Sequence, residues 1–547
     1  MRDVSRRHVL GMLGATGAAI TLGPLARTAH GAPAVKKGGQ IVVGLTQEPT
    51  VFNPLRPHIE VDRGVHFGLF DGLWRVDDGG QFVPNLAAEV PSLKNGGIAK
   101  NGLEYTFRLK KGVTWHDGKP FTARDVKFTH ELIMNPKFAV FSKIGHDIVA
   151  SLEATDAETV KVKLREPFAP FLTAWGDTWI VPQHVLGALP DPNTADFNTK
   201  SPVGTGPFRF ASRVAGDHLV LEANRAYHGG APALDRVIFK YIPDLTVLYT
   251  QFKAGALDVT GIQGISAEFY AEAKNLPGVT VNVHYTPSVE YIYFNHSKPW
   301  FKELAVRQAL YFAMDKKAII DQIYYGIPRP VEAYLPSTAW AYHPELPRHE
   351  WSVEKAKALL DQAGWKPGSD GIRAKGGVRL AFVNATTAGN KLREQAQALL
   401  QQNWRAIGVD MQIQNMPAAV VWGEYYTKSK YDTLLVGIQY SVGGDPDCLN
   451  RIHSKYIPAE TGGGRNVLWY KNPQLDALLE DGVREVDRGK RKAIYWKVQE
   501  LMRADLPYLP IFSYARLEGV RQGIVNYKLN SNTLTNSWNM FEWGWKA

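Results

Sequence analysis

Cysteine is almost missing from this chain. Its 547 residues include one cysteine, Cys448, so no disulfide bond can form within the chain. No cysteine stands near residue 31, where a covalent lipid anchor would need one. Cys448 lies beside Leu449 and Asn450 with no histidine-based constellation evident, so we interpret it as a small buried side chain and not as a catalytic nucleophile.

Motifs that carry catalysis are also missing. There is no HExxH, no CxxC, no serine elbow and no Walker loop, and the glycine-rich segment 204–207 lacks the lysine and the following helix of a phosphate loop. Asp445 and Asp447 are a carboxylate pair, but spacing alone does not show that two acids face one bond. His116 beside Asp117 is interpreted as structural. We therefore expect that the protein is not an enzyme and that it has no catalytic residue, metal or cofactor. The alternative is a periplasmic hydrolase.

Charge of one sign is nowhere concentrated, although the formal net charge is +10. The densest basic run, 488–492, lies beside Glu485 and Asp487 between two helical patterns. We interpret this run as a solvated connection and expect no nucleic-acid partner.

The first 31 residues have the pattern of an export signal. Arg6-Arg7 form a twin-arginine pattern, an apolar run rich in Gly and Ala follows over 9–25, and Ala29-His30-Gly31 offers small residues for cleavage. A disordered tail or a short anchor is the alternative, but a spanning helix needs about 20 apolar residues. We expect a Tat signal peptide over 1–31, cleaved near Gly31, and a mature protein free in a periplasm.

What is present is ample material for a core. Apolar residues make up 45% of the chain, and its length exceeds what a single core usually supports, so two lobes or three subdomains are expected. A strand–helix–strand pattern over 378–414 predicts a parallel sheet, and a long helix is expected over 303–325. Separate strands are expected over 279–285 and 289–294.

The most legible stretch is 104–134. Residues 105–109 alternate as a strand, 113–116 resume as a second strand, and Asp117-Gly118 close a hairpin turn. Thr122 stands at the position of a helix N-cap, with Asp125 as its capping-box acid, and Pro136 ends the helix.

This stretch resembles the signature of the extracellular solute-binding proteins of family 5, the peptide, opine and nickel receptors of ABC importers. Six segments in family order carry the resemblance: 105–126 (YTFRLKKGVTWHDGKPFTARDV), 201–208 (SPVGTGPF), 224–244 (NRAYHGGAPALDRVIFKYIPD), 306–316 (VRQAL with MDK), 356–365 (AKALLDQAGW) and 445–447 (DPD). The resemblance implies an α/β, two-lobed periplasmic binding protein fold (Venus-flytrap, type II or cluster C) with an extra subdomain on the first lobe. We expect lobe I at 32–54, 200–285 and 506–547, the extra subdomain at 55–199, and lobe II at 286–505.

Ligand contacts are expected where strands end at a cleft between the lobes. The strand 433–438 runs into our best candidate loop, and further candidates follow other strands or lie on a helix near that wall. For each candidate loop the alternative is a structural turn. For Trp422 the alternative is that it serves only in helix packing. The expected ligand-binding residues are Gln47, Asn384, Thr387, Trp422, Gln439, Tyr440, Ser441 and Asp445.

The resemblance implies a receptor that closes over a peptide or related small solute and delivers it to a membrane-embedded ABC permease with ATPase subunits. A monomer is expected. Peptide-binding relatives often carry an acid just before the Asp-Pro, whereas this chain has Ser441-Val442-Gly443-Gly444, and 384–387 offers no arginine. The missing charges favour an uncharged or unusual ligand, such as an oligosaccharide, opine or modified peptide. A receptor that reports to a sensor without import is a further alternative.

Overall fold

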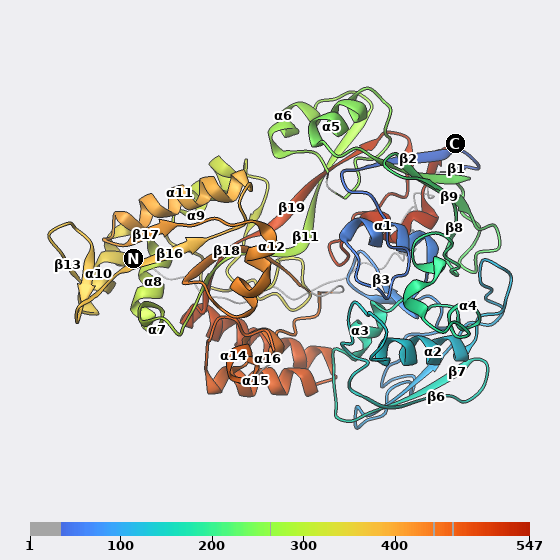
Figure 1. Cartoon of the computed structure of the whole chain (residues 1–547), viewed down its shortest axis with the longest axis horizontal. Helices are drawn as coiled ribbons and strands as arrows, with labels where there is room; N and C mark the ends of the chain where they lie inside the picture. Colours follow the sequence, from blue (N-terminus) through green and yellow to red (C-terminus); the bar gives the residue numbers. More distant parts are fainter. Residues whose placement is uncertain (1–33, 263, 441–443, 462–463) are drawn as a thin grey trace, which may run out of the picture.

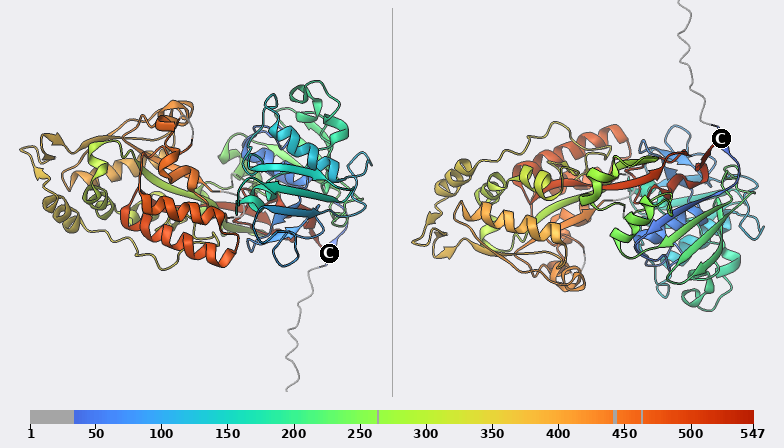
Figure 2. Two further views of the ribbon diagram at one scale, coloured as in Figure 1. Left: turned by 90° about the horizontal axis from the view of Figure 1, so that it is seen from below. Right: turned by 90° about the horizontal axis from the view of Figure 1, so that it is seen from above.

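Two bodies joined by a pair of long strands make up the molecule (Figures 1 and 2). The computed structural model describes residues 34–262, 264–440, 444–461 and 464–547. The expected signal peptide over 1–31 lies outside the described residues. No helix of the described part is long and apolar enough to cross a membrane.

The first body is built on two main sheets, beside two small ones of short strands. One has the order β2-β10-β9-β8 (Gln40–Leu45, Arg236–Tyr241, His218–Ala223 and Phe208–Val214), with β2 parallel to β10. Alternate residues of β2, among them Ile41, Val43 and Leu45, are buried, and α1 (Glu60–Leu69) packs near β8 and η8 (Asn536–Glu542). The other sheet has the order β5-β7-β6 (Glu104–Arg108, Thr159–Leu164 and Val149–Ala154).

The helix after the signature stretch forms as expected. α2 (Ala123–Met134) begins after Thr122, whose side chain accepts from the Arg124 N–H at 3.3 Å, while Asp125 accepts from the Thr122 N–H at 2.9 Å. The expected strand over 113–116 is wrong. One edge of β5 pairs with β7, and bridges from Ile98 to Tyr105 and from Ala87 to Leu109 occupy the other side. Residues 113–121 therefore join no sheet; they turn around Gly118, whose φ is 85°, and the His116 N–H donates to the Gly204 carbonyl at 2.8 Å.

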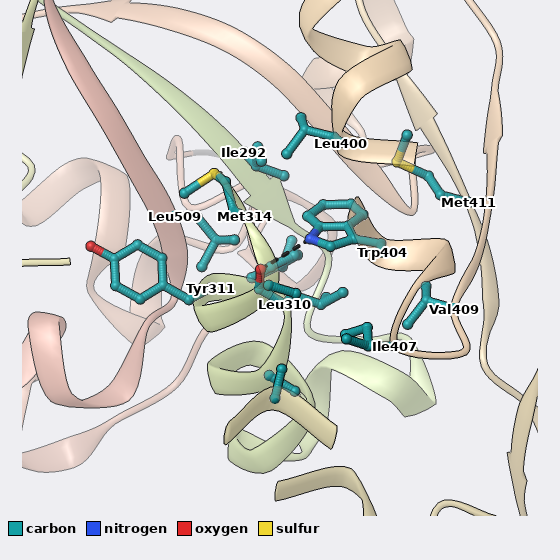
Figure 3. Packing of buried hydrophobic residues seen from close by; sticks show 14 of the residues in the cluster. Ile292, Leu310, Tyr311, Met314, Leu400, Trp404, Ile407, Val409, Met411 and Leu509 are labelled. Carbon is teal, nitrogen blue, oxygen red and sulfur yellow. Dashed lines mark hydrogen bonds between the residues drawn. The ribbon is translucent and has the colours of Figure 1, made fainter. Parts of the chain in front are cut away.

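The second body is built on a six-stranded sheet of order β12-β19-β11-β18-β16-β17 (Arg329–Pro330, Tyr508–Arg521, Val279–Phe294, Thr433–Gln439, Ala381–Ala385 and Asp410–Ile413). The expected strand–helix–strand unit is present: β16 and β17 are parallel and α11 (Lys391–Arg405) connects them. α11 packs with α8 (Leu304–Ala313) and α10 (Val353–Gln362) in a core where the Trp404 indole N–H donates to the Leu310 carbonyl at 3.0 Å (Figure 3). α15 (Pro473–Arg484) and α16 (Arg488–Asp505) contribute to a separate core.

Two strands connect the bodies. β11 is one strand of 16 residues and not the two that we expected, because β19 pairs with it from Val279 to Tyr293 across an irregularity between Tyr285 and Val289. The expected long helix over 303–325 is also broken: Met314 is extended, and the Asp315 carboxylate accepts from the Ala318 N–H to begin a new helix.

The remaining elements are short. In the first body they are β1 (Val35–Lys36), β3 (Trp74–Val76), β4 (Phe82–Pro84), α3 (Phe171–Gly176), α4 (Gln183–Leu186), η1 (Pro192–Thr194), η2 (Asp196–Asn198), α5 (Leu245–Lys253), η3 (Ala267–Phe269), α6 (Tyr270–Ala273), β20 (Ile524–Val525) and β21 (Gly544–Lys546). In the second body they are α7 (Pro299–Lys302), α9 (Lys316–Ala318), η4 (Ile319–Ile323), β13 (Lys366–Pro367), β14 (Arg373–Lys375), β15 (Val378–Arg379), α12 (Ala418–Val420), η5 (Val421–Tyr425), α13 (Leu449–Ile452), η7 (Ser454–Tyr456) and α14 (Pro458–Thr461).

Candidate functional site

A cavity of ≈ 530 Å³ lies between the two bodies. Its first wall comes from residues 54–179 of the first body, and its second wall from residues 445–465 of the second body. The polar and charged lining residues are His58, Arg63, Ser142, His146, Thr173, Asp177, Thr178, Asp445, Asp447, Asn450, Arg451 and Arg465, and the aromatic ones are Phe141, Phe168 and Trp179.

The second wall follows the buried strand β18, as the sequence predicts for a binding edge. After Gly444, whose φ is 63°, the Asp445 carboxylate makes two hydrogen bonds to the buried Arg491 guanidinium, at 2.6 and 2.8 Å. Asp445 also accepts from the Asp447 N–H, and Asp447 from the Leu449 N–H, both at 2.9 Å. These contacts fix the wall on α16.

Arg491 corrects one expectation. The basic run 488–492 is not a solvated connection, because α16 begins at Arg488 and Arg491 is 4% exposed. Burial lowers the pKa of Arg491, but the charge and hydrogen bonds of Asp445 outweigh burial and raise it above its ordinary value. A single acidic partner therefore keeps a basic side chain inside the second body.

Asp445 lines the cavity, and it also reaches across it. The Thr173 hydroxyl on α3 of the first body donates to the Asp445 carboxylate at 3.2 Å. Gln439 makes a second contact between the bodies: it is exposed, and its amide donates to the Glu60 carboxylate at 3.2 Å. Both residues, expected to bind a ligand, thus lie where the bodies meet.

Tyr440 and Asn384 are buried and already hydrogen-bonded. The Tyr440 hydroxyl accepts from the Tyr291 hydroxyl at 2.9 Å within the second core. The Asn384 amide donates to the Thr433 hydroxyl and its oxygen accepts from Gln397, both at 2.8 Å. The residues that line the cavity, within the described ranges, do not include either side chain.

The remaining expected residues are not gathered at the cavity. Thr387 is half-buried, and its hydroxyl lies 3.5 Å from an Arg393 nitrogen. Trp422 is 39% exposed and meets Tyr426 edge to face, and Gln47 is exposed after β2. Ser441 lies outside the described residues. A ligand-binding role for these residues stays a prediction.

Sequence reasoning missed the first wall. Arg63 on α1 pairs with Asp177 and lies over the Trp179 ring, 4.7 Å from the ring centre. Four aromatic residues, Phe168, Phe171, Trp175 and Trp179, recur within twelve residues of the sequence. Phe171 and Trp175 are fully buried, whereas Phe168 and Trp179 contribute to the cavity lining. Their spacing cannot separate the rings that face inward from those that face the cavity.

The histidines of this wall are neutral at neutral pH. Burial, and then the nearby His130, lower the pKa of His146 to about 3. Burial, and then the Arg63 charge, lower the pKa of His58. The first wall therefore presents one ion pair, neutral imidazoles and aromatic rings.

The second wall carries three charged groups that no described partner neutralises. Burial, and then the neighbouring Asp445 charge, raise the pKa of Asp447 to about 6. Arg451 and Arg465 contribute two guanidinium groups. The sequence has no acid at 441–444 and no arginine at 384–387. The charged groups of this wall come from other segments instead.

Two observations bear on chemistry other than binding. Cys448 is buried, as expected, and burial raises the pKa of its thiol, which opposes formation of a nucleophilic thiolate. Within the described ranges, no group of three His, Cys, Asp or Glu side chains is arranged to hold a metal ion.

The chain is similar to proteins of known family. The family model described as bacterial extracellular solute-binding proteins, family 5, matches residues 81–457. The oligopeptide-binding protein AppA of Bacillus subtilis is 30% identical over 502 residues, which cover 90% of this chain and 89% of that protein.

Solved structures agree. The structure of AppA from Bacillus subtilis in complex with a nonapeptide matches with a TM-score of 0.76 at 29% identity, covering 94% of this chain and 100% of that chain. NikZ from Campylobacter jejuni in complex with Ni(L-His) matches with a TM-score of 0.77 at 26% identity, covering 92% and 99%. The resemblance and the α/β, two-lobed fold expected from the sequence are confirmed.

Proposed function

The chain belongs to the bacterial extracellular solute-binding proteins of family 5, and from this membership we propose that it captures a peptide between its two bodies for an ABC-type import permease. The family consists of substrate-binding receptors, and membership places the chain among proteins that act outside the cytoplasm. The geometry of the cavity bears on which contacts would hold the ligand.

One observation carries the proposal: the cavity has one wall from each body, and two strands, β11 and β19, connect those bodies. A ligand that contacts both walls favours the arrangement in which the walls face each other. The bound form then differs in shape from the free form, which gives a permease a surface to recognise.

The cavity has the size of a small-ligand site. Small-molecule sites usually enclose about 300–1,000 Å³, and this cavity encloses ≈ 530 Å³. The peptide class is supported by AppA of Bacillus subtilis, whose structure holds a nonapeptide. A dissociation constant of about 1 μM requires about −8 kcal/mol, within reach of a few hydrogen bonds and aromatic burial.

The remaining parts of the proposal concern export and assembly. We propose that residues 1–31 direct export by the twin-arginine route, that the mature receptor is a monomer in the periplasm, and that ATPase subunits energise its permease. The lobe boundaries given by the sequence belong to this proposal as well.

The test measures binding with the cavity open and blocked. The mature chain is titrated with peptides of two to nine residues and with neutral oligosaccharides, by calorimetry and by thermal unfolding. A peptide at 100 times its dissociation constant should add about 2.7 kcal/mol to the free energy of unfolding. Asn450→Trp, at an exposed position in the cavity lining, should abolish that gain by filling the space.

The matched control is Gln474→Trp, at an exposed position on α15 outside the cavity lining. It should bind as the unchanged chain does. Peptide binding that survives Asn450→Trp would move the site elsewhere, and binding of oligosaccharides alone would replace the peptide with another solute.

A further inference from the structure

Arg451 and Arg465 stand together on the second wall of the cavity. Arg451 belongs to α13, directly after the anchored Asp445 loop, and Arg465 follows α14. The Arg465 N–H donates to the carbonyl of Asn450 at 3.0 Å, which holds the two segments side by side. Both guanidinium groups thereby belong to one small area of the wall.

Neither guanidinium forms an ion pair with a carboxylate of a described residue. Arg451 makes a long hydrogen bond of 3.4 Å to the Gln439 carbonyl, and no described residue accepts a hydrogen bond from the Arg465 side chain. The other arginines of this region differ: Arg63 pairs with Asp177, and Arg491 pairs with Asp445.

Burial opposes the positive charge of both guanidinium groups, although the net pKa shifts differ. Burial, and then the Arg451 charge, lower the pKa of Arg465. Burial also lowers the pKa of Arg451, but the surrounding tyrosines, first Tyr293 and then Tyr426 and Tyr440, outweigh burial and raise that pKa above its ordinary value. Two neighbouring cations in a partly desolvated wall are stabilised by an anion that binds both.

We propose that Arg451 and Arg465 form a subsite for a carboxylate group of the ligand. This rests on the proposed function and specifies the ligand class: a peptide whose carboxylate, at its C-terminus or on an acidic side chain, points to the second wall. Planar guanidinium groups bind carboxylates through paired N–H donors, so two of them can hold both oxygens of one carboxylate. Arg63 is excluded from this role because Asp177 already neutralises it.

The experiment compares peptides of one sequence that differ only in their carboxylates. The panel contains the free acid, the C-terminal amide, a version with an internal Glu, and glutarate as a carboxylate without a peptide bond. Each is titrated against the unchanged chain, Arg465→Gln and Arg451→Gln. Arg405→Gln is the control, because Arg405 is an exposed arginine of the second body that pairs with no carboxylate of a described residue and is not in the cavity lining.

Loss of a charge-assisted hydrogen bond should weaken binding about tenfold to a hundredfold. The free acid should therefore bind at least about tenfold more tightly than the amide, and Arg465→Gln should remove that difference while Arg405→Gln keeps it. If only the version with internal Glu shows the effect, the carboxylate is a side chain. Arg465 is exposed, so its variant should fold, and unfolding of ligand-free protein checks this.

Failure of this inference differs from failure of the proposed function. Equal binding of acid and amide, unchanged in both variants, would overturn the subsite while peptide capture stands. Binding of glutarate through the arginines without any peptide binding would support the subsite and overturn peptide capture. If no member of the panel bound, both would be wrong.

Discussion

Asp445 and Asp447 are two residues apart, and their carboxyl groups have opposite shifts of pKa. Burial raises the pKa of Asp445, but the Arg491 charge and hydrogen bonds outweigh burial and keep it below its ordinary value. For Asp447, burial and then the Asp445 charge outweigh the weaker effect of Arg491 and raise the pKa to about 6. Direct pairing with one arginine thus separates two acids of the same type in the same loop.

The raised pKa of Asp447 predicts a pH dependence of stability. Its folded pKa lies above its ordinary value of 3.8, so between about pH 4 and pH 6 the folded state binds more protons than the unfolded state. The contribution of Asp447 is therefore fully favourable below about pH 4 and falls as pH rises to about 6, by up to about 3 kcal/mol. Asp447→Asn should remove this fall and be more stable than the unchanged chain at pH 7.

Urea unfolding at pH 4 and pH 7 measures the difference. The control is Asp481→Asn, which changes an exposed aspartate of α15. A difference between Asp447→Asn and the unchanged chain that did not vary with pH would show that the carboxyl does not titrate in this range.

At the scale of elements, the second wall depends on a helix far along the chain. β18 delivers the chain to the cavity, but Arg491 on α16, 46 residues after Asp445, fixes the loop that follows. The end of β18 sets the position of the binding loop, whereas the contact with α16 sets its conformation.

Arg491→Met should therefore destabilise the protein by about 3–5 kcal/mol, because it leaves the Asp445 carboxylate buried without its partner. Ligand binding should weaken as well. The control is Arg484→Met on α15, whose ion pair with Glu480 is exposed and should contribute less than about 0.5 kcal/mol. Urea unfolding and calorimetry measure both variants, and equal losses in the two would contradict the role given to burial.

At the scale of the whole molecule, a few side chains connect the bodies besides β11 and β19. Thr173 contacts Asp445, and Arg488 donates to the Gln81 side chain at 2.9 Å. These contacts belong to the arrangement in which the walls face each other. Polar contacts of this kind can separate when the interface opens for ligand exchange.

The double change Thr173→Val with Arg488→Ala should shift the ligand-free protein toward a more open arrangement. Small-angle scattering should give a larger radius of gyration, and affinity should fall about twofold to tenfold because fewer molecules are competent to bind. Saturating ligand should restore the smaller radius. Lys497→Ala, at an exposed position on α16, is the control, and an unchanged radius in the double variant would assign closure to the strands alone.

Local chemistry explains which expectations held. The Thr122 capping box, the turn at Gly118 and the parallel pair around α11 depend on neighbouring residues, so the sequence predicts them. The strand expected over 113–116 needs a partner strand, and the helix expected over 303–325 breaks at Asp315, whose N–H donates to the distant Asn403 side chain at 2.9 Å. Both expectations were wrong because they depend on partners elsewhere.

By itself, the sequence determined the family, the α/β elements and the loop after β18, because motifs and periodicity are local properties. Only the tertiary structure decided what faces the cavity. It directed Tyr440 into the core, gave Asp445 to Arg491, and brought Arg63, Arg451 and Arg465 to the two walls from distant segments. Burial and pairing of charges depend on contacts across tens to hundreds of residues, which spacing along the chain does not encode.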